Sequence, residues 1–153
     1  MKGSVMNAHR IVACPSCGRS NRVPWARVAE GARCGACKRE LVATGAPIEL
    51  AEDELDALVA ESRVPVFVDF WAPWCGPCRV AAPEVAKLAQ QARGRFVVAK
   101  LDTERAPRSA AKHGIRSIPT FAVFAGGREL ERTSGSRSAA ALEQFVAQSI
   151  AKQ

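Results

Sequence analysis

The stretch Val64–Cys78, VPVFVDFWAPWCGPC, decides the fold class of this 153-residue chain. It begins with a run of β-branched and aromatic residues, Val64–Trp71, which is typical of a strand buried on both faces of a sheet. The segment Cys75-Gly76-Pro77-Cys78 follows, and the chain then continues in a helical pattern as far as Ala92. The stretch therefore predicts a buried strand, a turn and a helix, with two cysteines at the helix start.

The elements around this stretch alternate between strand and helix. Further buried strands are predicted at Phe96–Leu101 and Thr120–Ala125, and a last strand at Glu129–Thr133 follows the hairpin signal Gly126-Gly127. From a short first strand at Ile48–Leu50 onward, the predicted order is β-α-β-α-β-α-β-β-α. We expect an α/β fold with a parallel core, helices on both faces, and an antiparallel strand added by the late hairpin.

The composition limits the class of protein. Hydrophobic residues make up 48% of the chain, which suffices for a globular core. No apolar run approaches the roughly 18–20 residues that a membrane-spanning helix needs, and residues 1–13 lack the apolar segment of a secretory signal. We expect a cytoplasmic protein with no membrane partner, in a compartment where thiols stay reduced and the six cysteines are not structural disulfides.

The pair Cys75 and Cys78 is placed for redox chemistry. Free N–H groups and partial positive charge at a helix N-terminus favour the Cys75 thiolate, and Cys78 lies one turn further on, where it can close a disulfide ring. Gly76 and Pro77 add no positive charge between the cysteines, which favours a reductant over an oxidant. A metal half-site and a pair of buried core thiols are the alternatives for a lone pair of this spacing.

The segment Trp71–Arg79, WAPWCGPCR, resembles the active-site motif of the thioredoxin family, and the resemblance covers about residues 47–153. It implies the thioredoxin fold, a mixed sheet flanked by helices, and protein-disulfide reductase activity with Cys75 as nucleophile and Cys78 as resolving thiol. It also implies disulfide-containing client proteins, no bound organic cofactor, and re-reduction by a flavoprotein thioredoxin reductase that draws on NADPH.

The resemblance also implies roles outside the motif. Asp69 matches an aspartate buried beneath the dithiol, and burial should raise its pKa so that it can accept a proton from Cys78. Lys100 matches the neighbouring lysine; the alternatives are a purely structural pair with Asp69 or a lysine that reaches solvent. Pro119 matches a cis proline that faces the dithiol. The implied client-binding residues are Trp74, Gly76, Pro77, Ile118, Pro119 and Gly135.

The other four cysteines form the pairs Cys14/Cys17 and Cys34/Cys37, separated by 16 residues. Two such pairs at this distance predict a structural zinc site, because four thiolates complete a closed tetrahedron. Two additional redox dithiols are the alternative. Together with Asn21–Pro24, NRVP, the pattern is similar to the N-terminal ribbon of the zinc-containing bacterial thioredoxins, the thioredoxin 2 type.

A composition break at Thr44–Pro47 predicts a boundary, with a zinc ribbon in residues 1–46 and a thioredoxin domain in residues 47–153. A segment as short as the first, with few large apolar residues, usually needs a metal or disulfides to fold. The two histidines are expected outside both sites, His9 in a flexible N-terminal extension, Met1–Arg10, and His113 on the surface.

The net charge of +7 lies almost wholly in the ribbon. Residues 1–46 hold eight basic and two acidic side chains, whereas residues 47–153 hold 14 and 13. Four thiolates and one Zn²⁺ together contribute −2, so part of the basic excess balances the predicted metal cluster. We expect no nucleic-acid partner, because Trp25 is the single aromatic residue in the ribbon. A ribbon that binds nucleic acid or protein on a thioredoxin scaffold, and redox sensing through zinc loss, are the alternative functions.

Overall fold

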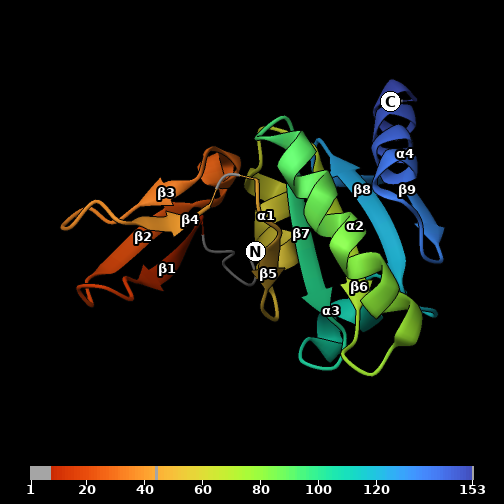
Figure 1. Cartoon of the computed structure of the whole chain (residues 1–153), viewed down its shortest axis with the longest axis horizontal. Helices are drawn as coiled ribbons and strands as arrows, with labels where there is room; N and C mark the ends of the chain where they lie inside the picture. The colour runs from red at the N-terminus through yellow and green to blue at the C-terminus, as the bar shows by residue number, and fades with distance from the viewer. Residues whose placement is uncertain (1–7, 44, 153) are drawn as a thin grey trace, which may run out of the picture.

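The computed structural model describes residues 8–43 and 45–152, which form two small two-stranded sheets followed by a five-stranded sheet with helices on both faces (Figure 1). The first two sheets are antiparallel, and a 3₁₀ helix lies between them. The elements of this N-terminal part are β1 (His9–Ala13), β2 (Ser20–Pro24), η1 (Trp25–Glu30), β3 (Ala32–Arg33) and β4 (Glu40–Val42).

The five-stranded sheet has the strand order β5-β7-β6-β8-β9. The predicted order of strands and helices is confirmed, and the predicted bounds differ by a few residues at most. The elements are β5 (Ile48–Leu50), α1 (Glu54–Glu61), β6 (Val66–Trp71), α2 (Gly76–Ala92), β7 (Val97–Asp102), α3 (Pro107–Lys112), β8 (Thr120–Ala125), β9 (Arg128–Ser134) and α4 (Ala139–Ala151).

The direction of β8 corrects the expected sheet. Strands β5, β7 and β6 are parallel, as predicted, but β8 pairs with β6 in the antiparallel direction, with Thr120 opposite Phe70. The connection from β7 to β8 contains only one short helix, α3, which spans about 9 Å, less than the length of about 20 Å of a six-residue strand. The chain therefore stays at the carboxyl end of β7 and enters β8 from that end.

The two faces of the sheet have separate apolar cores. In β6, Val66, Val68 and Phe70 pack in the core that α1 covers, whereas Phe67 packs in the core that α2 and α4 cover. Strands β6, β7 and β8 are buried along almost their whole length, because each is covered on both sides. No helix in the described part of the chain is long and apolar enough to cross a membrane.

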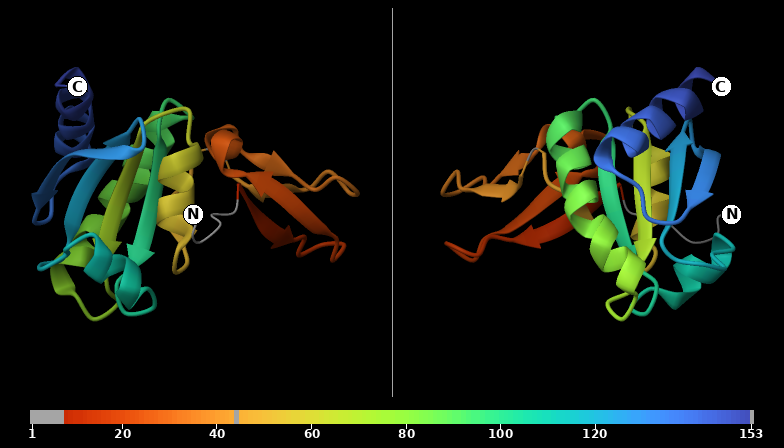
Figure 2. Two further views of the ribbon diagram at one scale, coloured as in Figure 1. Left: turned by 180° about the vertical axis from the view of Figure 1, so that it is seen from behind. Right: turned by 45° about the vertical axis from the view of Figure 1, so that its right-hand side comes forward.

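The N-terminal part packs against the sheet beside α1 and β5, as the rear view in Figure 2 shows. Val23 of β2 and the two η1 residues Trp25 and Val28 are buried in the same core cluster as α1 and β5. Gly94, after α2, marks a second close approach, because a Cβ there would lie 3.1 Å from the Ala29 carbonyl oxygen, and its φ is +83°.

Arg10 of β1 links the two parts of the molecule. Its Nε and Nη2 atoms donate to the Glu54 carboxylate at 3.2 and 2.6 Å, and Nη2 also donates to the Glu49 carbonyl oxygen at 2.6 Å. Its guanidinium lies 5.1 Å from the centroid of the Trp25 ring. The expected extension was therefore wrong for His9 and Arg10, which lie in a paired strand; residues 1–7 lie outside the described part.

His113 corrects another expectation. Its side chain is 15% exposed, and its Nε2 lies 3.2 Å from Asp56 Oδ1. The ring also meets Phe124 edge-on, with centroids 5.6 Å apart. The prediction of a surface position was wrong, because Asp56 of α1 and Phe124 of β8 lie against the ring.

Candidate active site and candidate metal centre

The helix start positions the dithiol as predicted. Cys75 is the N-cap residue of α2, and its Sγ accepts a hydrogen bond from the Cys78 amide at 3.2 Å. The two cysteines form a disulfide with their Cα atoms 5.2 Å apart, and both are buried. When this disulfide is reduced, the unpaired amides of the first helical turn stabilise a thiolate at Cys75.

Two segments distant from the dithiol in the sequence, Ile118–Pro119 and Gly135, meet beside the disulfide. The Ile118 carbonyl oxygen lies 3.8 Å from Cys75 Sγ, and the Ile118–Pro119 peptide bond is cis, as the resemblance implied. The Pro119 carbonyl oxygen accepts a hydrogen bond from the Gly135 amide at 3.0 Å. The Trp74 side chain, next to the nucleophile, is 65% exposed. The structure thus brings together the residues expected to bind clients; Gly76 and Pro77 form the first turn of α2.

Asp69 is buried in the middle of β6. Its side chain is 1% exposed, and neither carboxylate oxygen has a hydrogen-bond partner in the described part of the chain. Burial raises the pKa of Asp69 to about 7, against the opposing effect of the positive charge of Lys100. The predicted rise of this pKa is confirmed.

Lys100 lies beside Asp69 in the sheet, because the two residues are in register on β7 and β6. Its ammonium group does not donate to Asp69 and lies 4.4 Å from the centroid of the Trp71 ring. A tight structural Asp69–Lys100 ion pair is therefore absent from the described residues. Sequence reasoning missed Glu49, which is in register with Lys100 on the other side; strand register is the signal that could have found it.

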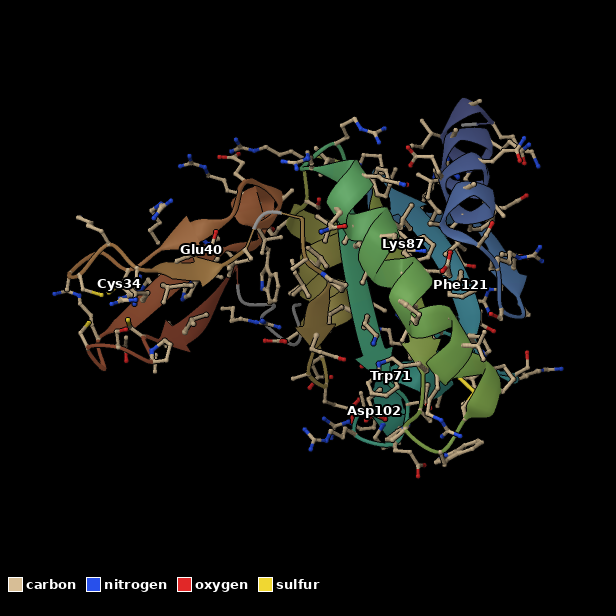
Figure 3. All side chains as sticks on the ribbon, in the orientation of Figure 1. Cys34, Glu40, Trp71, Lys87, Asp102 and Phe121 are labelled. Atoms are coloured by element: carbon tan, nitrogen blue, oxygen red, sulfur yellow. A yellow bond between two sulfur atoms is a disulfide. The ribbon has the colours of Figure 1, made fainter. Side chains whose placement is uncertain are left out.

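The four remaining cysteines converge at the end of the ribbon opposite the sheet. All four sulfur atoms lie within 4.8 Å of one another, and the Cys14–Cys37 and Cys17–Cys34 pairs are each 3.6 Å apart. Tetrahedral Zn–S bonds of about 2.3 Å place sulfur atoms about 3.8 Å apart, so this donor set fits Zn²⁺. Figure 3 shows Cys34 at the left end of the molecule and the yellow disulfide bond at the lower right, near α2.

Two matching turns hold these cysteines. The Gly18 amide donates to the Cys14 carbonyl oxygen at 2.8 Å, and the Lys38 amide donates to that of Cys34 at 3.0 Å. Gly18 and Lys38, which follow the second cysteine of each pair, both have positive φ angles, of 79° and 68°. The two halves of the site are thus built alike.

Backbone amides favour the thiolate at the first cysteine of each pair, because they lower the pKa of Cys14 and of Cys34. The pKa of Cys17 is instead raised to about 11, since the Arg19 backbone lowers it less than the neighbouring thiols and burial raise it. The amides of Cys37 and Ala36 lower the pKa of the Cys34 thiol to about 6, against the opposing effect of burial. Asn21 joins the two halves, because its side chain accepts from the Gly35 amide at 2.9 Å and donates to the Arg19 carbonyl oxygen at 3.0 Å. A role for Asn21 was not predicted; its position between the two pairs was the available signal.

Comparison with known families agrees with both halves of the structure. The thioredoxin family model matches residues 46–148, and the model described as "Thioredoxin 2, N-terminal", a zinc ribbon, matches residues 13–39. The chain belongs to the thioredoxin family. It is a protein-disulfide oxidoreductase of the thioredoxin type, and its clustered cysteines together with the ribbon match indicate a zinc-binding N-terminal part.

Individual relatives cover most of the chain. Thioredoxin C-3 of Corynebacterium nephridii is 40% identical over 143 residues, which is 94% of this chain and 97% of that protein. The M-type chloroplastic thioredoxin of Chlamydomonas reinhardtii is 40% identical over 137 residues, 90% of this chain and 93% of that protein. The crystal structure of chloroplastic thioredoxin z superposes with a TM-score of 0.63 at 30% identity, covering 69% of this thioredoxin and 96% of that chain.

Proposed function

We propose that this thioredoxin reduces client disulfides through two thiol–disulfide exchanges at Cys75 and Cys78. The observation that carries the proposal is the position of Cys75 Sγ, which caps α2 and lies 3.2 Å from the Cys78 amide nitrogen. The same amide that donates to Cys75 Sγ in the disulfide would stabilise a thiolate in the reduced protein, and the thiolate is the reactive form for attack on a disulfide.

The two exchanges conserve sulfur atoms and electrons. The Cys75 thiolate attacks one sulfur of the client disulfide, forms a mixed disulfide and releases the other client sulfur as a thiolate. Cys78 then loses its proton and attacks Cys75 Sγ, which releases the second client thiolate and closes the Cys75–Cys78 disulfide. Asp69 is proposed as the acceptor of the Cys78 proton, because a carboxyl group with a pKa of about 7 accepts and returns protons near neutral pH.

Clients are proposed to bind around the exposed Trp74 side chain. Ile118 and Pro119 lie against the nucleophile, and the Gly135 amide fixes the Pro119 carbonyl group. An extended client segment beside Ile118 would bring its disulfide to Cys75 and could pair with the backbone there. Gly76 and Pro77 are proposed to complete the binding surface.

Zinc is proposed to have a structural role. Cys14, Cys17, Cys34 and Cys37 would supply all four ligands, so no position is left for a substrate. The bound ion would supply the crosslink that a ribbon without a separate apolar core lacks. In line with this division of roles, we propose the domain boundary between residues 46 and 47.

The electron donor is proposed to be a thioredoxin reductase, and the compartment is proposed to be the cytoplasm. Both proposals follow from the chemistry, because the Cys75–Cys78 disulfide must be reduced again after each turnover and zinc-binding thiolates need reducing surroundings. Disulfide-containing proteins are the proposed client class.

Insulin reduction in the presence of dithiothreitol tests the proposal, together with zinc quantitation on the same samples. Cys75→Ser should lose the reductase activity and retain its zinc, because the two sites lie at opposite ends of the molecule. Cys17→Ser is the matched control and should lose zinc affinity. Insulin reduction by Cys75→Ser at the wild-type rate would contradict the proposed chemistry.

A further inference from the structure

Three charged side chains lie in one row across the sheet. Glu49 on β5 is in register with Lys100 on β7, and Lys100 is in register with Asp69 on β6. Residues in register on neighbouring parallel strands project from the same face of the sheet. Lys100 therefore stands between two carboxyl groups, the buried one of Asp69 and the solvent-exposed one of Glu49.

The outer end of this row opens to solvent. Glu49 and Trp71 line a surface cavity of about 480 Å³ together with Asp102 and Arg105. The Lys100 ammonium lies over the Trp71 ring at this end, 4.4 Å from its centroid, where a ring face attracts a cation. Among the described residues no ion pair joins Lys100 to Glu49 or to Asp69, so the ammonium group lies over the ring within the field of both carboxyl groups, and the Asp69 carboxylate oxygens have no hydrogen-bond partner.

The position of this cation decides what Asp69 can do. A direct Lys100–Asp69 pair would stabilise the carboxylate and make it a weak base for the Cys78 proton. If the Lys100 ammonium group instead lies toward Glu49, burial remains the main influence on the pKa of Asp69. We propose that Glu49 is a positioning residue that holds the Lys100 ammonium away from Asp69 and so keeps Asp69 able to exchange a proton during the resolving step. This inference rests on the proposed role of Asp69.

The charges that face this row are few. Asp69 experiences Lys100, which lowers its pKa, and Glu49, which raises it, while burial has the largest effect. Glu49 faces Lys100, Asp102 and Arg105. From α2, which covers the same face, the disulfide-bonded Cys75 and Cys78 contribute no charge.

Another carboxylate at the opening already has its own partners. Glu52 accepts a hydrogen bond from the Ser109 amide at 2.7 Å and lies near Arg108. Within the described part of the chain the indole Nε1 of Trp71 has no hydrogen-bond partner, yet it lies close enough to Glu49 to favour the ionised form of that carboxyl group. Asp102 also lines the opening, but its Oδ1 accepts a hydrogen bond from the Glu104 amide at 2.9 Å, whereas Glu49 is in register with Lys100 on the outer side.

The test is a direct titration of the Asp69 carboxyl carbon by NMR in the full-length oxidised, zinc-loaded protein. Glu49→Gln removes the outer negative charge and releases Lys100 toward Asp69, and both effects favour the ionised form of Asp69. The Asp69 midpoint should fall by about half a pH unit, roughly threefold in the dissociation constant. Glu49→Asp should restore part of the shift. Glu61→Gln, an exposed substitution at the far end of α1, should leave the midpoint unchanged.

A double-mutant cycle separates positioning from a simple effect of charge. If Glu49 acts by holding Lys100, Glu49→Gln should shift the Asp69 midpoint by less than half as much in a Lys100→Met background. An equal shift in both backgrounds, or an unchanged midpoint in Glu49→Gln itself, would overturn the inference. The underlying role of Asp69 is judged separately, because Asp69→Asn should abolish the acid limb in the pH profile of insulin reduction, whatever the midpoint in Glu49→Gln.

Discussion

The ribbon and the thioredoxin domain are held together in different ways. The sheet of the thioredoxin domain has an apolar core on each face, and most of the residues in both cores come from its own strands and helices. Among the described residues of the ribbon, five are buried, namely Cys14, Val23, Trp25, Val28 and Cys34. Two of these are zinc-site thiols, and the other three pack in the core of the neighbouring domain.

The comparison teaches that the ribbon depends on two external supports. At one end, four sulfur atoms replace an apolar core, and at the other end, Trp25 and Val28 share the core of the sheet. The thioredoxin domain can lose either support and keep most of its own contacts. The two regions should therefore respond unequally to the same perturbations.

Removal of zinc should have the largest effect, and the strands of the ribbon should lose the most protection. Structural zinc contributes roughly 10 kcal/mol or more to the folding of small metal domains. A strong chelator at neutral pH should therefore abolish the hydrogen-exchange protection of β1 to β4 and leave that of β6, β7 and β8 largely intact. If the ribbon amides stayed protected in metal-free protein, the ribbon would need an apolar core of its own. That result would contradict the comparison between the two regions.

Trp25→Ala should destabilise the thioredoxin domain although Trp25 lies in the ribbon. Loss of a buried Trp side chain leaves a cavity and typically costs about 3–5 kcal/mol, and Trp25 is 2% exposed in the core shared with α1. Urea unfolding monitored by far-ultraviolet circular dichroism measures the loss. Ile11→Ala is the control, because Ile11 is 58% exposed and its loss should change the free energy of unfolding only slightly. Equal effects of the two variants would contradict a shared core.

Asp69→Asn should stabilise the thioredoxin domain at neutral and alkaline pH. The pKa of Asp69 is raised from 3.8 to about 7 by burial, so the folded state binds a proton that the unfolded state has lost over this range. This contribution to stability is complete below pH 4 and is lost as the pH rises through 7, a change of about 4 kcal/mol. Unfolding curves from pH 4 to 9 should fall for the wild type and stay flatter for the variant; parallel curves would contradict the raised pKa.

Arg10→Met should loosen the contact between the two regions. The Arg10 side chain is 23% exposed and that of Glu54 is 25% exposed, so solvent screens part of the interaction. We expect a loss of about 1–2 kcal/mol in thermal unfolding, because the guanidinium also bonds the Glu49 carbonyl group. Arg27→Met removes an exposed pair with Glu30 within η1 and should cost less; a larger loss in Arg27→Met would argue against Arg10 as the link.

Local signals predicted much of the fold and of the site. The apolar run of β6 and the cysteine pair at the start of α2 are adjacent in the sequence, so their spatial relation follows from secondary structure alone. The two ribbon pairs are also local, because each CxxC loop brings its own sulfurs together. These features were predicted with the correct residues.

Features that depend on distant contacts were not predicted. The direction of β8 depends on the path of the chain after β7, and the partial burial of His113 depends on Asp56 of α1. The roles of Trp25 and Arg10 follow from docking between the two regions. In the sequence, Glu49 is one acidic residue in a three-residue strand. Its proposed positioning role follows only from its register with Lys100 on the neighbouring strand.

The two edge strands of the sheet affect whether this thioredoxin aggregates with the unfolded clients on which it acts. Edge β5 has three residues, too few to template a long added strand, and the ribbon packs beside it. Edge β9 carries Arg128, Glu129, Glu131 and Arg132, and its pairing with β8 is interrupted by a register shift. Charged, interrupted edges resist strand-to-strand aggregation. The edges of the sheet thus disfavour strand pairing with the extended, aggregation-prone chains on which a disulfide reductase acts.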